Sequence, residues 1–231
     1  MNLPSNKVPE GLKLQIGNDE IKRKTKIKFL GMTIDDKLEW TDHVRHVRNK
    51  ISSGIYAINK VKHFMNRKHL LTLYYSLIYP YLDYGISLWG STSQTNKHKV
   101  FVMQKKAVRI ISGAKYNDHT NPLFTKLKIL KLEDIHELQI AKYMYALNNG
   151  TLPKALINMF TMNNEIHTHN TRNRYNPHVT TRRTIATSKT IRHKGPVVWY
   201  TIPNHIKKDK RTLKSFTRKL RSAMLVKYSQ L

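Results

Sequence analysis

The sequence of 231 residues has no cysteine, few acidic residues and no long apolar segment. Without cysteine it has no disulfide, no zinc knuckle and no thiol nucleophile. It contains no run of about 18 apolar residues, so no transmembrane helix is expected. Its first residues also lack the apolar core of a signal peptide. These absences predict an intracellular protein, nuclear, cytoplasmic or both, with no membrane partner.

Acidic residues are greatly outnumbered by basic ones. Asp and Glu total 14 against 42 Lys and Arg, a formal net charge of +28, which favours nucleic acid as a partner over an acidic membrane surface. Residues 161–231 alone contain 16 Lys or Arg and 2 acids. Because apolar residues are sparse from 161 to 195, this part is either a loosely packed extension or a segment that orders on nucleic acid. Its candidate nucleic-acid contacts are Arg172, Arg174, Arg182 and Arg183.

Strand-like patterns occur only near the amino terminus. Lysines alternate with apolar residues from Lys26 to Phe29, and residues 13–16 are also strand-like. Residues 17–19, Gly-Asn-Asp, are typical of a turn, so we predict a β-hairpin of residues 13–16 with 25–32. Two strands are marginally stable alone. The hairpin therefore either packs on the helices that follow, with or without a binding role, or has lost the sheet to which it belonged.

Helical periodicity dominates from residue 41 to residue 160. Thr41 is a good N-cap for a helix to about residue 64, in which one apolar stripe comprises Val44, Val47, Ile51, Ile55 and Ile58. Asn66 is predicted to cap a second, almost fully buried helix that Pro80 ends. Further helices are expected at 94–112, from Asn121 onward, at 132–149 and at about 212–226.

Two features of this helical region each allow two interpretations. At about 100° per residue, one arc of the 94–112 helix contains Val100, Met103, Ala107, Ile110 and Ile111, and the opposite arc contains His98, Lys105, Lys106 and Arg109. The basic arc either is simply solvated or contacts phosphates without reading bases. The aromatic residues between 79 and 89 either pack in the core or stack on bases.

Residues 29–40, Phe-Leu-Gly-Met-Thr-Ile-Asp-Asp-Lys-Leu-Glu-Trp, resemble the last palm motif of non-LTR (LINE-type, jockey-like) retrotransposon reverse transcriptases. The resemblance continues in order through residues 73–85, 88–90, 104–111, 122–124, 167–172, 195–199 and 202–203. It implies that Phe29, Leu30 and Gly31 belong to the primer-grip hairpin and that a thumb follows. A thumb helix lies along the template-primer duplex, which implies a phosphate-facing role for Lys105, Lys106 and Arg109.

No catalytic constellation is evident in the sequence. A polymerase needs paired carboxylates that hold two metal ions, but Asp35 and Asp36 follow the primer-grip-like strand and are interpreted as a solvated turn. His43 and His46 share a helical face, and His167 and His169 lie two residues apart. Neither pair has a third ligand nearby in sequence, so we predict no metal site.

These observations predict a mainly α fold: a helical thumb-like bundle preceded by a β-hairpin, with a basic, partly irregular C-terminal extension. The expected domains are 1–40, 41–160 and 161–231. The predicted function is that of a reverse transcriptase fragment without the catalytic palm, which binds RNA or RNA–DNA template-primer duplex through basic helices. Its expected partners include the missing palm and fingers. The parent enzyme would use magnesium, but this chain is expected to hold no cofactor and to be inactive alone.

Two alternatives stay open from the sequence. One is a coopted or stand-alone basic helical module that binds RNA or another protein. The other is a decayed element with no function.

Overall fold

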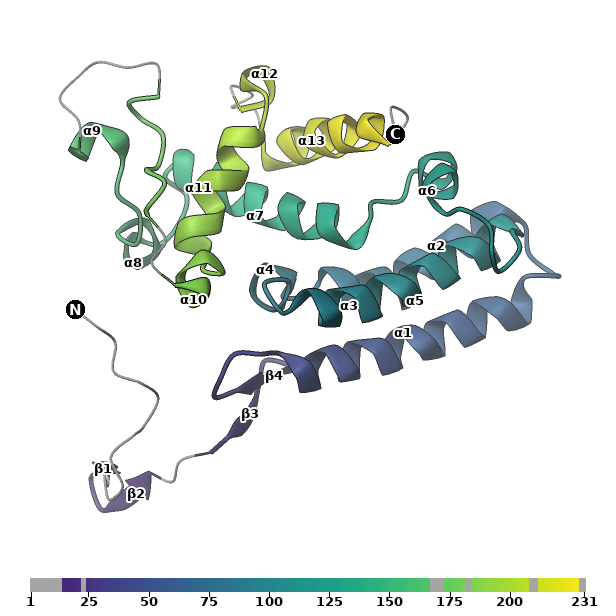
Figure 1. The fold of residues 1–231 in the computed structure, drawn as a ribbon, viewed down its shortest axis with the longest axis horizontal. Helices are drawn as coiled ribbons and strands as arrows, with labels where there is room; N and C mark the ends of the chain where they lie inside the picture. The colour runs from purple at the N-terminus through teal and green to yellow at the C-terminus, as the bar shows by residue number, and fades with distance from the viewer. Residues whose placement is uncertain (1–13, 22–23, 167–172, 182–183, 208–211, 229–231) are drawn as a thin grey trace.

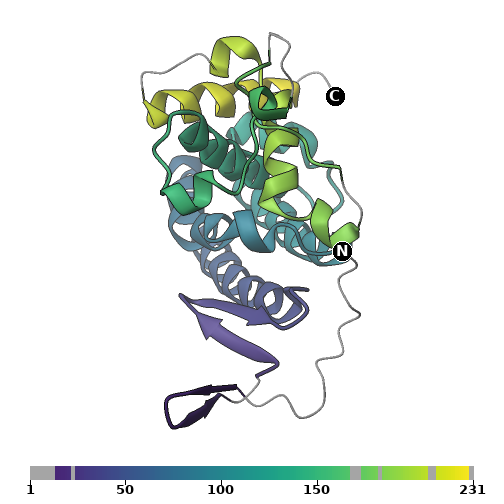
Figure 2. The same cartoon turned by 90° about the vertical axis from the view of Figure 1, so that its left-hand side faces the viewer.

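The computed structural model describes residues 14–21, 24–166, 173–181, 184–207 and 212–228. It is mainly helical, with β-hairpins before the helices, as the sequence predicted (Figure 1). Two antiparallel hairpins replace the single one expected: β1 (Leu14–Ile16) pairs with β2 (Asp19–Ile21), and β3 (Lys26–Phe29) pairs with β4 (Met32–Asp35). The β3–β4 hairpin lies beside the helical body, whereas β1–β2 extends away from it (Figure 2).

The predicted pairing of residues 13–16 with 25–32 is wrong because each strand turns straight back. Gly17 and Asn18 lead directly into β2. Leu30 and Gly31 form a second two-residue turn, with φ of 46° and 77°. Positive φ at both positions is what a type I′ hairpin turn requires, and glycine adopts it without strain.

Helix α1 (Thr41–Val61) buries the predicted apolar stripe in full. The helix ends earlier than the expected residue 64, and its N-cap is Trp40, which has a left-handed φ of 64°. The prediction that Thr41 caps the helix is therefore wrong. Its Oγ1 instead accepts a hydrogen bond from Nδ2 of Asn96, at 3.3 Å, which links the start of α1 to α5 (Gln94–Ser112).

Helix α2 (Arg67–Leu77) begins as predicted, since the Asn66 side chain accepts a hydrogen bond from the His69 amide at 3.2 Å. The prediction that α2 is almost fully buried is wrong. Its outer face meets solvent, so that only Leu70 and Tyr74 are buried within the helix. Pro80 does not follow α2 directly but lies in the first turn of α3 (Tyr79–Asp83), after which comes α4 (Ile86–Trp89).

A second group of helices covers the first. It comprises α6 (Asn121–Leu127), α7 (Leu132–Asn148), α8 (Lys154–Ile157), α9 (Asn163–Ile166), α10 (Ile185–Ser188), α11 (Ile191–Thr201), α12 (Asn204–Lys207) and α13 (Leu213–Lys227). Helix α7 packs against α3 and α4 on one side and against α11 and α13 on the other. One hydrophobic cluster consequently extends from Trp40 to Tyr228. No helix of the described residues is long and apolar enough to cross a membrane.

Helix α11 was not expected from the sequence because it contains Gly195 and Pro196. Glycine at this position allows α11 to approach α7 closely. A Cβ atom on Gly195 would lie only 2.5 Å from the sulfur of Met144. A Gly-Pro pair normally indicates a break in a helix, and here the packing against α7 outweighs that preference.

A fully buried amide joins three parts of the helical body. The Gln104 side chain donates hydrogen bonds to the Tyr74 hydroxyl, at 3.0 Å, and to the Leu130 carbonyl, at 2.8 Å. Its oxygen accepts from the Leu132 amide at 2.9 Å. Both amide hydrogens and the oxygen are thus satisfied, which is the condition for burying such a group without a large cost.

Replacing Gln104 with Met should lower the free energy of unfolding by about 3 kcal/mol, because the substitution leaves buried groups of three other residues without a partner. Urea denaturation followed by circular dichroism measures the change. Gln94→Met, at the exposed start of the same helix, is the matched control and should change stability by less than about 0.5 kcal/mol. Equal effects of the two substitutions would show that the Gln104 network contributes nothing specific.

A second buried polar residue, His136 on α7, is 2% exposed. Burial, reinforced by Lys194 and Lys97, lowers the pKa of His136 to about 3. Its Nδ1 lies 3.4 Å from Nζ of Lys194. Lys97 in turn pairs with Glu133, with 3.2 Å between Nζ and Oε1. His136 is therefore neutral in the folded protein at neutral pH.

Stability should consequently fall as the pH drops below about 6.5, the ordinary histidine pKa, because the unfolded chain then binds a proton that folded His136 does not. Between pH 7.5 and 5 this amounts to about 2 kcal/mol. Unfolding free energies of the wild type and of His136→Leu, compared at the two pH values, isolate the contribution. The variant should lose about 2 kcal/mol less than the wild type, and His98→Leu, an exposed control, should behave like the wild type. Equal losses in all three proteins would contradict a buried neutral His136.

Candidate nucleic-acid interface

The primer-grip-like residues lie at the tip of the β3–β4 hairpin. Phe29 and Leu30 are 58% and 69% exposed, and Gly31 shares their turn. The Tyr84 hydroxyl donates to the Leu30 carbonyl at 2.5 Å. The tip is thus held against the start of the helical body, while its apolar side chains face outward.

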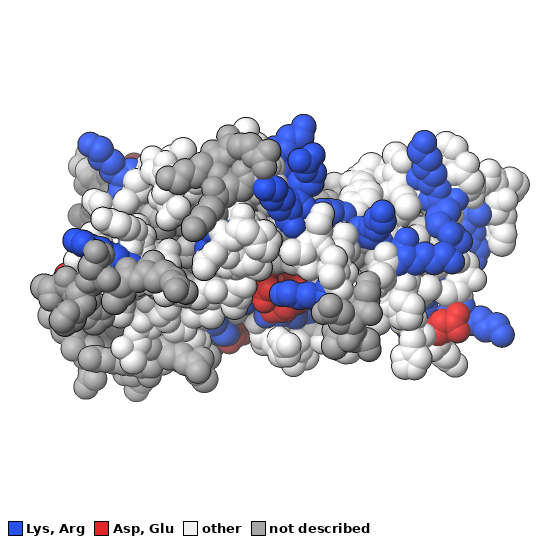
Figure 3. Space-filling view, turned by 90° about the horizontal axis from the view of Figure 1, so that it is seen from above, with Lys and Arg blue, Asp and Glu red and all other residues white. Residues whose placement is uncertain are grey.

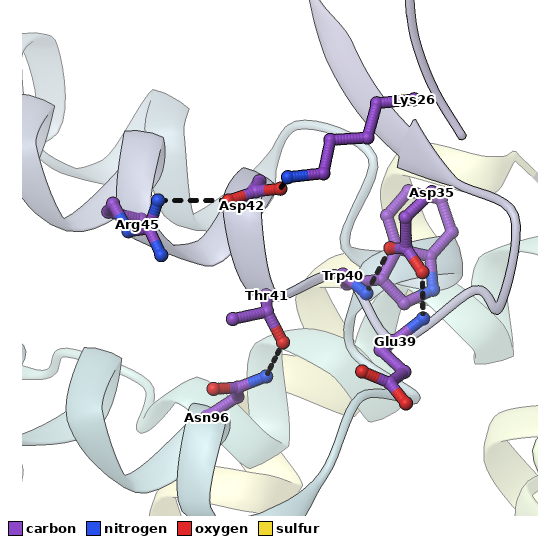
Figure 4. A network of polar contacts seen from close by, with 8 residues as sticks. All are labelled: Lys26, Asp35, Glu39, Trp40, Thr41, Asp42, Arg45 and Asn96. Atoms are coloured by element: carbon purple, nitrogen blue, oxygen red, sulfur yellow. Dashed lines mark hydrogen bonds and ion pairs between the residues drawn. The ribbon is translucent and has the colours of Figure 1, made fainter. Parts of the chain in front are cut away.

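Asp35 fastens the base of this hairpin to α1. Its two carboxylate oxygens accept hydrogen bonds from the backbone amides of Glu39, at 2.9 Å, and Trp40, at 2.8 Å (Figure 4). Lys26 pairs with Asp42 across the same junction, and its hydrogen bond lowers the pKa of Asp42. The interpretation of Asp35 as part of a solvated turn is therefore wrong: it ends β4, is half-buried and supports the start of the helix. The described residues include no group of three or more His, Asp or Glu side chains that could hold a metal ion.

The three predicted contacts on α5 lie on its outer side but do not form one cluster. Lys105 is half-buried, with Nζ 4.6 Å from the centre of the Phe101 ring. Lys106 and Arg109 instead line a groove of about 390 Å³ beside Tyr56 and Tyr116. The structure therefore separates Lys105 from the other two.

The predicted apolar arc of α5 is right in part. Val100, Ala107 and Ile111 are buried, whereas Met103 and Ile110 are only half-buried. Asn96, Gln104 and Val108 complete the buried face. The sequence pattern assigned Gln104 no role because an uncharged polar residue in an amphipathic helix is usually solvated.

Sequence reasoning missed further cations beside Arg109. A second groove, of about 460 Å³, adjoins the first and is lined by Arg109, Lys62, His63 and Arg67. We call the four charged residues of the two grooves, Lys62, Arg67, Lys106 and Arg109, the basic end. The available signal was the concentration of basic residues around the turn between α1 and α2.

The basic end combines residues from several elements. It receives Lys106 and Arg109 from α5, Arg67 from the first turn of α2, and Lys62 from the end of α1. Arg109 is positioned by a hydrogen bond from Nε to the Asp118 carbonyl, at 3.1 Å. None of the residues that line the two grooves is acidic. Figure 3 shows basic side chains gathered over this end of the molecule, where α2 and α6 lie in Figure 1.

Of the predicted arginines in the C-terminal extension, Arg172, Arg182 and Arg183 lie outside the described residues. Arg174 is half-buried, and its guanidinium carbon lies 5.6 Å from the centre of the Tyr175 ring. Its carbonyl accepts a hydrogen bond from the Asn164 amide at 2.9 Å. The structure does not bring Arg174 into the grooves of the basic end.

The segment around Arg174 is fastened to α11 by side-chain amides. Asn163 Nδ2 donates to the Tyr200 hydroxyl at 2.8 Å, and Trp199 Nε1 donates to Asn176 Oδ1 at 3.3 Å. An isolated β-bridge joins Met162 to Pro177. This part of the extension therefore has defined contacts with the helical body.

No family model matches the chain, and no solved structure matches it. Among curated proteins, the RNA-directed DNA polymerase from mobile element jockey of Drosophila melanogaster is 29% identical over 124 residues, which cover 52% of this chain and 14% of that polymerase. The corresponding jockey polymerase of Drosophila funebris is 28% identical over 110 residues, 46% of this chain and 12% of that protein.

A further relative is the probable RNA-directed DNA polymerase from transposon BS of Drosophila melanogaster. It is 25% identical over 122 residues, which cover 50% of this chain and 13% of that polymerase. The matched region thus spans only a small part of each of these relatives. The predicted resemblance is confirmed: about half of this chain is similar to a region of jockey-like, LINE-type retrotransposon reverse transcriptases.

Proposed function

We propose that this chain is a post-palm region of a LINE-type reverse transcriptase that binds template-primer duplex or RNA through phosphate groups at the basic end. The observation that carries the proposal is the convergence of Lys62, Arg67, Lys106 and Arg109 around two adjoining grooves without an acidic lining residue. Lys and Arg contacts of this kind give affinity for a polyanion without reading its sequence.

The surroundings of these cations favour an anionic ligand. Lys62, Arg67 and Lys106 form no ion pair with a described carboxylate, so binding a phosphate there breaks no existing pair. Arg109 is held by the Asp118 carbonyl through Nε, which leaves its two terminal nitrogens for a ligand. In this proposal, the other predicted residues make secondary phosphate contacts outside the basic end. They are Lys105, Arg172, Arg174, Arg182 and Arg183.

The palm and fingers of such a polymerase are the proposed protein partner. The apolar side chains of Ile27, Phe29 and Leu30 are each more than half exposed on a two-stranded hairpin. Two strands are marginal alone, and a palm sheet would cover these side chains. In this proposal Phe29, Leu30 and Gly31 keep the primer-grip role that the resemblance implies. The palm, outside this chain, would hold the catalytic magnesium ions.

Changing both Lys106 and Arg109 to Gln should weaken binding to a short B-form DNA duplex whatever its sequence. The plot of log affinity against log salt should become shallower by roughly 1.8 units if each residue contacts one phosphate. Fluorescence anisotropy over a range of salt concentrations measures both quantities. A matched control is Lys154→Gln, an exposed lysine on α8. It should leave the slope unchanged if its side chain contacts no phosphate.

Unfolding free energies should be measured for both variants, so that a loss of binding is not caused by a loss of structure. If the folded double variant keeps the wild-type affinity and salt slope, the basic end is a solvated surface and the proposal fails.

Polymerase activity provides a separate test of the fragment interpretation. Since the described residues offer no cluster of metal-binding side chains, and two-metal phosphoryl transfer requires one, the purified chain should extend no primer. The assay contains primer, template, deoxynucleotides and magnesium. Extension above a control without protein would contradict the proposal that catalysis resides outside this chain.

A further inference from the structure

Another groove, separate from the two grooves of the basic end, lies at the opposite end of α1. This hairpin groove has a volume of about 660 Å³ and is formed by the β3–β4 hairpin, α1 and the α3 region. Its charged and aromatic lining residues include Lys28, His43, His46, Lys50, Tyr81 and Tyr84. The mixture of cations with aromatic rings differs from a purely apolar docking surface.

His43 is the most buried of the polar residues that line this groove. The residue is 3% exposed, and its Nδ1 accepts the Thr33 backbone amide at 3.4 Å. A neutral imidazole that accepts at Nδ1 carries its hydrogen on Nε2. Burial, with a smaller effect of His46, lowers the pKa of His43 and keeps the ring neutral. The Nε2 atom has no partner among the described residues and almost no exposed surface, so His43 lies beneath the groove and is not assigned a ligand contact.

The charges of the groove favour an anion. Lys28, His46 and Lys50 form no ion pair with any described carboxylate. The acidic lining residue is Asp83. Its Oδ1 is already engaged, because it accepts from Nε2 of Gln139 at 2.5 Å and from the Tyr79 hydroxyl at 3.3 Å.

Two tyrosine rings provide flat surfaces in the same groove. Tyr81 is 36% exposed and Tyr84 is 55% exposed. The hydrogen bond from the Tyr84 hydroxyl to Leu30 holds that ring in place. Aromatic rings beside cations are the combination with which proteins bind single-stranded nucleic acid, since every base has a face that can stack.

We propose that the hairpin groove binds a nucleotide of single-stranded RNA or DNA. A base stacks on Tyr81, and Lys28 and Lys50 neutralise the adjoining phosphates. This site goes beyond the proposed duplex binding, since it lies at the other end of α1 and uses stacking as well as charge.

The test measures binding of a fluorescein-labelled single-stranded oligoadenylate to the full chain. Tyr81→Ala should weaken this binding by roughly 5-fold to 150-fold, the range expected for the loss of one stacking partner. Lys50→Gln should make the salt slope shallower by about 0.7, as for one phosphate contact on a single strand.

Phe64→Ala is the matched control for removal of a ring, because Phe64 is 87% exposed and lies outside the hairpin groove. It should not change oligoadenylate affinity. Tyr81→Ala and Lys50→Gln both change exposed side chains, so they decide the outcome without disturbing the core. Wild-type affinity in folded Tyr81→Ala would overturn the proposal. The proposal would also be overturned if Tyr81→Ala weakened the binding of a labelled polyglutamate peptide as much as that of oligoadenylate, since the groove would then be a site for acidic protein.

The same variants separate this proposal from duplex binding at the basic end. Tyr81→Ala should leave the affinity for the B-form duplex unchanged. When Tyr81→Ala is added to the Lys106 and Arg109 double variant, it should weaken oligoadenylate binding by the same factor as in the wild type. If duplex binding fails but oligoadenylate binding follows this pattern, the hairpin groove stands alone. If the double variant lowers duplex affinity while Tyr81→Ala leaves oligoadenylate affinity unchanged, only the basic end stands.

Discussion

The buried side-chain amide of Gln104 is the constraint on which the arrangement of the helices depends. It joins Tyr74 of α2 to the backbone that connects α6 with α7. An amide buried in an apolar core is tolerated only when its hydrogen bonds are satisfied, so it admits few relative positions of these segments. Helix α7, positioned in this way, then carries α11 and α13 on its other side. The basic end and the hairpin groove lie on the framework that results.

The two candidate binding surfaces lie at opposite ends of α1 and differ in the side chains that line them. At the basic end, cations from three segments surround open grooves without acidic lining residues. At the hairpin groove, cations accompany tyrosine rings. Phosphate contacts alone suit a duplex of any sequence, whereas rings require bases that are free to stack. In the proposed account, α1 therefore separates a duplex site from a single-strand site.

The sequence predicted features that depend on local periodicity and capping. The buried stripe of α1, the Asn66 cap and the bounds of α5 follow from spacing within single helices. It did not predict contacts between distant segments, such as the Gln104 network, since periodicity does not encode which helix is the neighbour. The predicted strand pairing was wrong because alternation alone does not distinguish one long hairpin from two short ones. Lys62 and Arg67 were missed because their meeting with Arg109 depends on how α1, α2 and α5 pack. The resemblance to LINE-type polymerases could be recognised without the structure, because it depends on the order of several short motifs along the sequence.

Lysine footprinting on the intact chain tests the central claim, that the basic end is the duplex-binding surface, most directly. The chain is acetylated briefly with and without an RNA–DNA duplex, and modification of each lysine is measured by mass spectrometry. Lys62 and Lys106 should be protected by the duplex, while Lys154 on α8 should be modified to the same extent in both samples. Equal modification of Lys62 and Lys106 with and without the duplex, under conditions in which the duplex is bound, would contradict the account.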